Sequence, residues 1–338
     1  MRRTGLEATV ILLLPFALGC MADSTIPELP AQAGLWTASA APSAILRLDP
    51  RQLADTGGRD PATIVTTASA RLERLLAVAF DDQGTLWVAS QSDSTILSFP
   101  SGALAGGGSQ TAARVITPVR GSLSGPTGLA FDARGRLWVV DNGTGTLNRY
   151  DAAQLAAGGA QEPAVTIRMP GSPSAIAFDA AGALWVADHQ FNLIVKFPAE
   201  SLATSGSKPP VFYLQDSAHT LMNPAGIAFD AAGNLWVANL SARTIVSFTP
   251  TQLAVGGAQL PHVVLSSNAG SLHNPLGVAF DAVGNLWVVN ADGGVTGFAR
   301  ASLDASGTPA PITQVQISGH SLFWSLAFWP KPAGLPLN

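Results

Sequence analysis

One short pattern of apolar and polar residues recurs along the chain. An apolar run such as GIAF is followed by a polar D-x-x-G segment and then by a second apolar run, LWVA. The copy that begins at Gly226 reads GIAFDAAGNLWVAN. Similar copies begin at Ala77, Gly128, Ala175 and Gly277. Each apolar run is short and is bounded by turn-forming residues, which indicates buried β-strands rather than helices.

The sequence around this phrase predicts four strands in each repeat. The two apolar runs form a hairpin, because Asp can cap the D-x-x-G turn and Gly can adopt a positive φ angle. A third strand of the type TIVSF (244–248) follows. Next comes a spacer with the core L-A-x-G-G (155–159 in one copy), which predicts one helical turn ended by Gly. The fourth strand is of the type PHVVLSS (261–267).

The number and offset of the repeats predict the architecture. The repeat tryptophans are Trp36, Trp87, Trp138, Trp185, Trp236 and Trp287, at spacings of 51, 51, 47, 51 and 51 residues. Four strands repeated at this period are typical of β-propeller blades. Trp36 has no GIAF phrase before it, and the last Phe phrase, SLAFWP from Ser325 to Pro330, has no LWV phrase after it. We therefore expect an all-β, six-bladed propeller with four-stranded antiparallel blades, in which the C-terminal strand joins the N-terminal blade and leaves no open edge.

The repeat phrase resembles that of NHL-repeat and related six-bladed propellers, which have G-I-A-V-D-x-x-G-N-I-Y-V-A-D where this chain has GIAFDAAGNLWVAN from Gly226. It is more distantly similar to propellers of the virginiamycin B lyase and gluconolactonase types. The resemblance covers nearly all of residues 34–330 and implies the fold. The lactonase type implies an acidic metal ligand in the segment that enters a first strand, where this chain has segments such as Pro126-Thr127-Gly128. The lyase type implies a His and Glu pair near a metal, and here Glu73 and Glu162 fall on outer or linker segments, as does Glu200.

The N-terminus has the features of a targeting signal. Arg2 and Arg3 precede an apolar run over residues 8–18, which is too short to span a bilayer and is typical of a secretory signal. The run ends at Ala17-Leu18-Gly19-Cys20, which resembles a bacterial lipobox and implies lipid attachment at Cys20; the alternative is a plain secretory signal. We expect a signal peptide over 1–19, a tether over 20–33, a single propeller over 34–332 and a tail over 333–338. This predicts a lipid-anchored protein of the bacterial cell envelope, at the outer membrane if the host is Gram-negative.

Composition narrows the classes of function. Only 12% of the 338 residues are charged while 47% are hydrophobic, and the net charge is −4. So few charges exclude a nucleic-acid binder that relies on a basic stripe. The single cysteine excludes a disulfide scaffold and a cysteine-based zinc site. We expect a monomer that contacts the membrane only through its lipid.

Polar residues at one repeat position are the first candidates for chemistry. The residue after LWVA always carries a short side chain with an oxygen, in the set Ser39, Ser90, Asp141, Asp188, Asn239 and Asn290. Six copies favour a structural hydrogen bond within each blade. The alternative is a ring of oxygen ligands that holds a cation such as Ca²⁺ at the mouth of the channel.

Residues that do not repeat are the second set of candidates. Four of the five histidines fall on loops of one face, namely His189, His219, His273 and His320, whereas His262 lies in an outer strand. They are either exposed loop residues or contributors to a zinc site or a catalytic base. Trp324 is expected near the channel, where it plugs the opening or stacks on a ligand. The candidate residues at the channel mouth are Asp141, Asn142, Asp188, His189, Asn239, His273, Asn290, His320 and Trp324.

Two hypotheses on function follow from these patterns. The first is a binding or interaction scaffold without catalysis, with a protein, peptide or carbohydrate as its ligand and no cofactor. The alternative is a metal-dependent hydrolase or lyase that uses the histidine loops at the channel mouth, with Ca²⁺ or Zn²⁺ as the metal.

Overall fold

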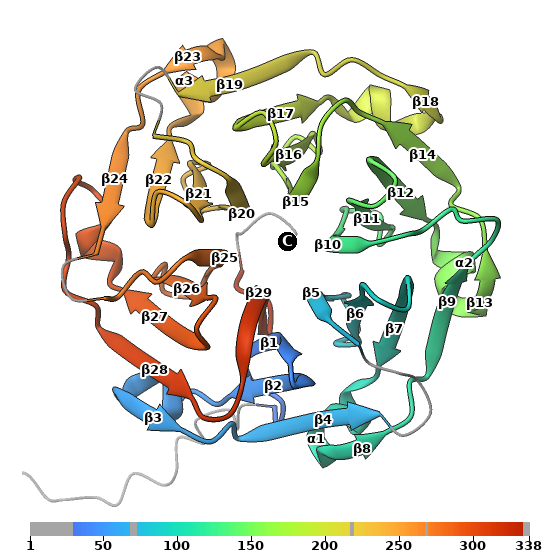
Figure 1. Ribbon diagram of the computed structural model, residues 1–338, viewed down its shortest axis with the longest axis horizontal. Helices are drawn as coiled ribbons and strands as arrows, with labels where there is room; N and C mark the ends of the chain where they lie inside the picture. Colours follow the sequence, from blue (N-terminus) through green and yellow to red (C-terminus); the bar gives the residue numbers. More distant parts are fainter. Residues whose placement is uncertain (1–29, 68–72, 217–219, 268–269, 334–338) are drawn as a thin grey trace, which may run out of the picture. The chain divides into compact units, whose positions relative to one another are not determined.

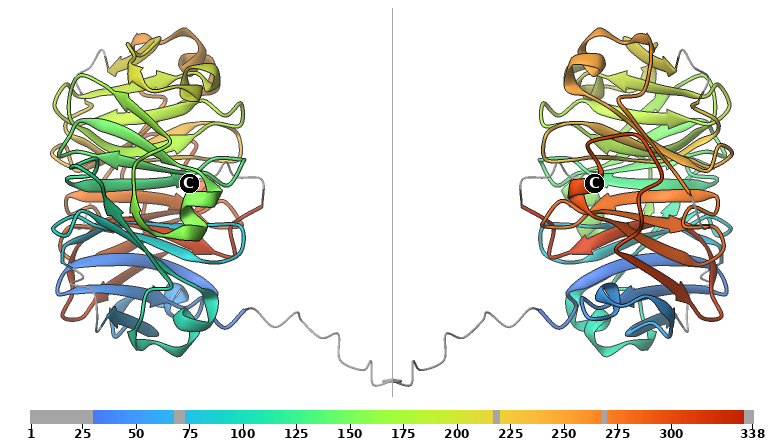
Figure 2. Two further views of the ribbon diagram at one scale, coloured as in Figure 1. Left: turned by 90° about the vertical axis from the view of Figure 1, so that its right-hand side faces the viewer. Right: turned by 90° about the vertical axis from the view of Figure 1, so that its left-hand side faces the viewer.

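A computed structural model describes residues 30–67, 73–216, 220–267 and 270–333. Residues 1–19, Cys20 and His219 lie outside the described residues, so the expectations for them stay predictions. Residues Ala31–Asn338 form one compact unit. Within its described part, six β-sheets surround a common centre, which confirms the six-bladed β-propeller (Figure 1). Figure 2 shows the same ring from two sides, with the strands of each blade running between its two faces.

Each blade has four antiparallel strands, from the centre outward. The innermost strands are β29 (Ser321–Trp329), β5 (Leu75–Phe80), β10 (Pro126–Phe131), β15 (Pro173–Phe178), β20 (Pro224–Phe229) and β25 (Pro275–Phe280). The second strands are β1 (Gly34–Ala41), β6 (Leu86–Ser90), β11 (Leu137–Asp141), β16 (Leu184–Asp188), β21 (Leu235–Asn239) and β26 (Leu286–Asn290). The third strands are β2 (Ser43–Leu48), β7 (Thr95–Phe99), β12 (Thr146–Tyr150), β17 (Leu193–Phe197), β22 (Thr244–Phe248) and β27 (Gly294–Phe298). The fourth strands are β4 (Thr63–Thr67), β9 (Arg114–Pro118), β14 (Val165–Arg168), β19 (Phe212–Asp216), β24 (Val263–Ser266) and β28 (Thr313–Ile317). In this order the sets define blades 1 to 6.

The spacer between the third and fourth strands forms a short helix and then an unexpected short strand. The helices are α1 (Ser101–Gly106), α2 (Ala152–Ala157), α3 (Pro250–Val255) and the 3-10 turns η1 (Gln52–Ala54), η2 (Ala199–Ala203) and η3 (Arg300–Ser302). The short strands are β3 (Gly57–Arg59), β8 (Gly108–Gln110), β13 (Gly159–Gln161), β18 (Gly206–Ser207) and β23 (Gly257–Gln259). Each short strand pairs in parallel with the fourth strand of the preceding blade, as β8 does with β4. A single bridge between Leu265 and Gly307 takes this place next to blade 5. The spacer therefore joins neighbouring blades, and most blades gain a fifth strand.

Two strand pairings close the ring, one at its centre and one at its rim. At the centre, β29 pairs antiparallel with β1, from Gly34 opposite Trp329 to Ala41 opposite Ser321. At the rim, β3 of blade 1 pairs in parallel with β28 of blade 6. The C-terminal strand thus completes blade 1, as the offset of the repeats predicts.

Aromatic pairs fill the interfaces between blades. The second-strand tryptophan of each blade meets a phenylalanine at or next to the end of the innermost strand of the next blade, as Trp138 meets Phe178 with ring centroids 6.3 Å apart. The other pairs are Trp36–Phe80, Trp87–Phe131, Trp185–Phe229, Trp236–Phe280 and Trp287–Phe328. All are edge-to-face, the geometry that aromatic rings prefer. The repeat tryptophans are therefore core residues between blades.

The aspartate of each D-x-x-G turn has two kinds of partner, the backbone amides of the turn and the indole of the repeat tryptophan. In blade 5, Oδ1 of Asp230 accepts hydrogen bonds from the backbone amides of Ala232 and Asn234, both at 2.9 Å. Its Oδ2 accepts a hydrogen bond from the indole N–H of Trp236, also at 2.9 Å. The same indole bond recurs with Asp81, Asp132, Asp179 and Asp281. The aspartate therefore caps the turn and also satisfies the buried tryptophan.

Candidate functional site

The loops that enter the innermost strands and leave the second strands lie on one face of the ring, here called the loop face. The innermost strands surround the centre (Figure 1), and each has a β-bulge close to its start. The bulges involve Leu76, Thr127, Ser174, Ala225–Gly226, Leu276 and Trp324–Ser325. A bulge changes the direction in which the side chains point at the edge of a sheet. The centre of the loop face is therefore bordered by apolar or small residues.

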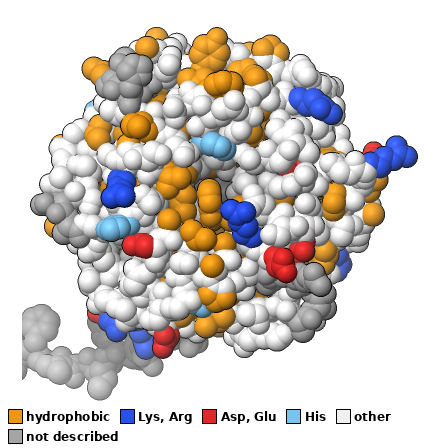
Figure 3. All heavy atoms as spheres, in the orientation of Figure 1, with side chains coloured by type: hydrophobic (Ala, Val, Ile, Leu, Met, Phe, Trp, Pro, Cys, Tyr) orange, Lys and Arg blue, Asp and Glu red, His pale blue; other side chains and the backbone are white. Residues whose placement is uncertain are grey.

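Neighbouring innermost strands pack directly on one another. The Oγ atom of Ser174 donates a hydrogen bond to the carbonyl oxygen of Pro224 in the next blade, at 2.8 Å. A side chain at Gly226 would place its Cβ 2.3 Å from the carbonyl oxygen of Leu276, so glycine is required for this close approach. Figure 3 shows the loop face, with apolar side chains in a strip across its centre and histidine and charged side chains around it.

Asp141 is fully buried and holds two loops of blade 3 together. Its Oδ2 accepts a hydrogen bond from the backbone amide of Ser124 at 2.8 Å, and its Oδ1 accepts from Gly143 at 3.1 Å and Thr144 at 3.3 Å. Burial raises the pKa of Tyr150, at the far end of the neighbouring strand, above its ordinary range, and the negative charge of Asp141 raises it further. The Asp141 carboxylate is thus satisfied by the backbone.

The equivalent residues of blades 4 and 6 make the same kind of contact. Asp188 is buried, and its Oδ1 accepts from the backbone amides of Ser172 at 3.2 Å and Gln190 at 3.0 Å. Oδ1 of Asn290 accepts from the backbone amide of His273 at 3.0 Å. These side chains join the loop that leaves the second strand to the loop that enters the first.

The three remaining blades vary this arrangement. Ser90 donates to the carbonyl oxygen of Glu73 at 3.1 Å. Ser39 donates to the carbonyl oxygen of Ser321 at 3.2 Å. Asn239 is fully buried, and its Nδ2 donates to the hydroxyl of Thr244 at 3.2 Å while its Oδ1 has no hydrogen-bond partner.

The described histidines of the loop face lie on three different blades. His189 is half-buried after β16. His273 is 52% exposed, and its Nδ1 lies 3.8 Å from Oδ2 of Asp292. Nδ1 of His320 lies 3.3 Å from the hydroxyl of Ser39, which is buried. No three His, Cys, Asp or Glu side chains of the described residues are grouped as metal ligands.

The other two candidates also take part in packing or pairing between strands. Nδ2 of Asn142 donates to the carbonyl oxygen of Pro173 at 2.9 Å and so connects blade 3 to blade 4. Trp324 is half-buried at the bulge of β29. The sequence reasoning missed Asp292, the partner of His273. A comparison of the repeats could have identified it, because Asp292 is acidic where the equivalent residues of blades 3, 4 and 5 are Gly143, Gln190 and Ser241.

Replacing Asp141 by Ala is expected to destabilise the fold rather than remove a ligand. Three backbone amides of the loops lose their acceptor, at a cost of about 2–4 kcal/mol. His273→Ala, at a half-exposed position, is the matched control and should change stability by less than about 0.5 kcal/mol. Urea unfolding of the two variants measures the difference through the midpoint at constant slope. An Asp141→Ala midpoint equal to that of the parent would contradict the structural role.

Comparisons with known proteins give the fold but no family. No protein-family model matches the sequence, and a search among curated proteins found no match. Virginiamycin B lyase from Staphylococcus aureus is 13% identical, with 80% of this chain and 82% of that chain covered and a TM-score of 0.53. A chain of a nidogen/laminin complex is 15% identical, with coverage of 86% and 96% and a TM-score of 0.59. A protein of unknown function from Bacteroides caccae is 10% identical, with coverage of 86% and 97% and a TM-score of 0.61. The chain is therefore a six-bladed β-propeller whose structural neighbours include a lyase, a chain of a nidogen/laminin complex and a protein of unknown function.

Proposed function

We propose that this chain is a lipid-anchored, extracytoplasmic propeller that acts as a binding scaffold and uses the loop face to contact a protein or peptide. The observation that carries the proposal is the chemistry of that face. Its recurring polar side chains are engaged within the blades, as Asp141 is by three backbone amides. The centre they surround carries apolar side chains (Figure 3).

Exposed apolar residues on the loops support the same proposal. Phe191 is 49% exposed after β16, Met222 is 47% exposed before β20, and Leu322 is 40% exposed at the start of β29. The first two loops are joined, since the backbone amide of Asn223 donates to Oδ1 of Asn192 at 2.6 Å. Exposed apolar side chains on two joined loops can form part of an interaction site.

The anchor has its own test. The full chain, expressed in a bacterium that processes lipoproteins, is expected to enter the detergent phase in Triton X-114 partition. The Cys20→Ser variant should move to the aqueous phase, because it lacks the thiol that carries the lipid. Met21→Ala is the matched control and should stay with the detergent. A Cys20→Ser protein that still enters the detergent phase would rule out the anchor.

The contact surface is tested with substitutions on opposite faces. The probe is bis-ANS, an apolar dye whose fluorescence reports exposed apolar sites. We expect the paired variant Phe191→Ser and Met222→Ser to lose most of the dye binding. Val283→Ser removes a side chain that is 68% exposed, on a D-x-x-G turn of the other face, and should keep it. Equal loss in both variants would argue against a binding function of the loop face.

A lyase reaction is the second candidate, and the His273–Asp292 contact at 3.8 Å is the observation that favours it. A carboxylate beside an imidazole can orient it as a general base. A catalytically inactive variant of the S. aureus lyase has been crystallised with quinupristin, so quinupristin is the substrate to test here. Under the scaffold proposal the purified domain leaves quinupristin intact and binds no stoichiometric metal. Turnover that His273→Ala abolishes at unchanged stability would favour the lyase instead.

A further inference from the structure

The chain enters the propeller at the face opposite the loop face, here called the turn face because the D-x-x-G turns lie on it. Gly34 opens β1 opposite Trp329, and Trp329 occupies the position that the turn aspartate has in the other blades. Blade 1 has no such turn, because its two inner strands, β29 and β1, come from opposite ends of the chain. The residues directly before Gly34 therefore lie at the end of blade 1 where the other blades have a turn.

Two side chains of blade 1 bond to this entry segment, Ala31–Ala33. The indole N–H of Trp36 donates a hydrogen bond to the carbonyl oxygen of Gln32 at 2.9 Å. The guanidinium of Arg47 lies 5.9 Å from the centre of the same indole ring. Its Nη1 donates to the carbonyl oxygens of Ala31 at 2.6 Å and Ala33 at 3.1 Å. Every residue of the entry segment is thus held through its backbone.

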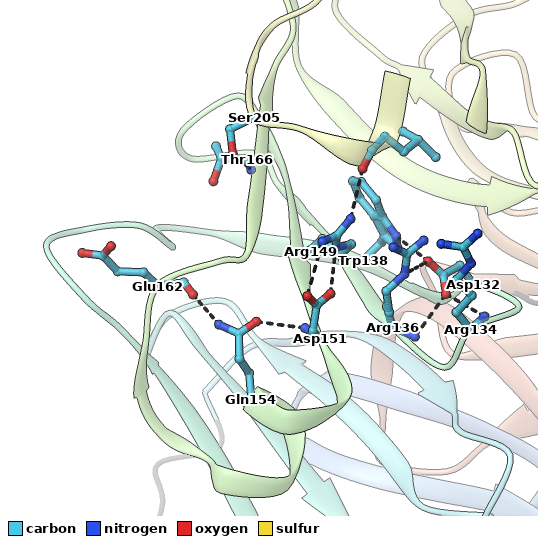
Figure 4. A network of polar contacts seen from close by, with 11 residues as sticks. Asp132, Arg134, Arg136, Trp138, Arg149, Asp151, Gln154, Glu162, Thr166 and Ser205 are labelled. Carbon is cyan, nitrogen blue, oxygen red and sulfur yellow. Dashed lines mark hydrogen bonds and ion pairs between the residues drawn. The ribbon is translucent and has the colours of Figure 1, made fainter. Parts of the chain in front are cut away.

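Blade 3 has the same arrangement around a D-x-x-G turn (Figure 4). There the indole N–H of Trp138 donates to Oδ2 of the turn aspartate Asp132 at 3.1 Å. Arg149, in register with Trp138, lies 6.0 Å from its ring and pairs with Asp151 at 2.8 Å. The arginine in the same register of blade 1 bonds to the entry segment instead. The entry segment therefore takes the place of a turn, and it is fixed to the turn face.

The side chain of Gln32 also connects the entry segment to its neighbours. It is only 8% exposed. Its side-chain oxygen accepts the indole N–H of Trp329 at 2.8 Å, and its amide nitrogen donates to the carbonyl oxygen of Ser101 in blade 2 at 3.0 Å. The free length of a membrane tether therefore ends at Ala31, which is exposed on the turn face.

The length of this tether limits which face can reach the membrane. The 11 residues from Cys20 to Pro30 span at most about 40 Å when fully extended. To bring the loop face to the lipid, the tether has to cross two strand spacings from β2 to β8, about 10 Å. It then has to pass along the depth of the ring, about 30 Å for the nine residues of β29. This path equals the whole extended length, whereas the turn face meets the lipid with no such stretching.

The turn residues themselves suit a position beside lipid headgroups. Three turns expose only methyl-bearing side chains at their variable positions, namely Ala180–Ala181, Ala231–Ala232 and Ala282–Val283. Bringing such groups to a membrane surface removes no charge from water. In blade 2, Asp82 is paired with Lys331 at 3.0 Å, and blade 3 exposes the cation Arg134, which can pair with phosphate headgroups.

We propose that the turn face lies toward the membrane and that the loop face is presented away from it, to a partner outside the same bilayer. This inference rests on the lipid anchor at Cys20, which is part of the proposed function. Its structural basis is the entry segment, because Trp36 and Arg47 hold the start of the propeller on the turn face.

The test uses the chain from residue 20 onward with six histidines in place of residues 20–25, which keeps the length of the tether. It is bound to phosphatidylcholine vesicles that contain a nickel-chelating lipid and a rhodamine-labelled lipid. The chain contains the whole compact unit and no cysteine, so one can be introduced for a donor dye. Ala181→Cys places the dye on the turn face, and Gln190→Cys places it on the loop face of the same blade, both at exposed positions. We expect more energy transfer to the labelled lipid from position 181 than from position 190.

A Gly/Ser insertion of about 40 residues before Ile26 is the control, because it lets either face reach the lipid and should remove most of the difference. Equal transfer from the two positions with the natural length, or more from position 190, would overturn the orientation. A difference that the insertion leaves unchanged would reject the tether as its cause. If a variant of this pair does not fold, as judged by thermal melting, Ala232→Cys and Ser241→Cys repeat the comparison in blade 5. Since the nickel lipid replaces the lipid on Cys20, a failure here is distinct from a failure of the anchor, which the partition of Cys20→Ser tests.

Discussion

A chain that ends at Gly319 should fail to fold into a monomeric ring. This truncation removes β29, which pairs with β1 from Gly34 to Ala41 and supplies the buried side chains of Phe323 and Leu326. It also removes Phe328, the edge-to-face partner of Trp287 at 6.2 Å. Loss of each buried large side chain costs about 2–5 kcal/mol. Since domains are stable by only about 5–15 kcal/mol, the combined loss exceeds what the fold can withstand.

The matched control for this truncation ends at Ala333. It keeps β29 and Trp329 and removes only residues 334–338, so its melting temperature should equal that of the full propeller. Size-exclusion chromatography and far-UV circular dichroism distinguish the two chains, because an exposed inner edge of blade 1 should produce aggregates. A truncated protein that elutes as a monomer and melts within a few degrees of the parent would show that β1 does not need β29.

Asp230→Ala is expected to destabilise the fold strongly, although Asp230 belongs to a turn with exposed residues. The substitution removes the acceptor of two turn amides and leaves the indole N–H of Trp236, which is 2% exposed, without a partner. Hydrogen bonds to a charged group contribute about 1.5–3 kcal/mol each, and a buried unsatisfied donor adds its own cost. The expected loss is therefore about 3–5 kcal/mol, measured by guanidinium unfolding with tryptophan fluorescence.

Two further variants separate the contributions of Asp230. Asp230→Asn keeps Oδ1 for the turn amides but presents an amide group to the indole, so its loss should be about half as large. Ala231→Ser changes the exposed neighbour and should be close to neutral. If Asp230→Ala unfolds at the same denaturant concentration as Ala231→Ser, the bond to Trp236 contributes nothing to stability.

The blades could be predicted from the sequence because each depends on local patterns. Short apolar runs, D-x-x-G turns and a constant tryptophan spacing specify the hairpins, and the offset between Trp36 and Phe328 specifies how the ring closes. The fifth strands could not be predicted in this way. Segments such as Gly257–Gln259 have exposed or half-buried side chains without alternation, and they pair with a different blade.

The candidate site could be predicted only in part. The repeat position of Asp141 and Asn290 was apparent, but their partners belong to loops that differ in length and sequence from blade to blade. The contact between His273 and Asp292 joins two loops of blade 6.

The hydrogen bond between the turn aspartate and the repeat tryptophan was missed for another reason. Capping of the turn was already a sufficient reason for the aspartate to recur. The constant spacing, with the tryptophan six positions after the aspartate in every copy, was the signal for the bond.

The double closure of the ring determines how blade 1 responds to a mechanical pull. Tension applied to the chain before Gly34 acts along β1, which lies between β29 on one side and β2 on the other. The hydrogen bonds on both sides of β1 then share the force in shear, instead of opening one after another as in a strand peeled from an edge. The strand nearest the expected membrane tether is thus also held from both sides, so the ring can remain closed while its N-terminus is under tension.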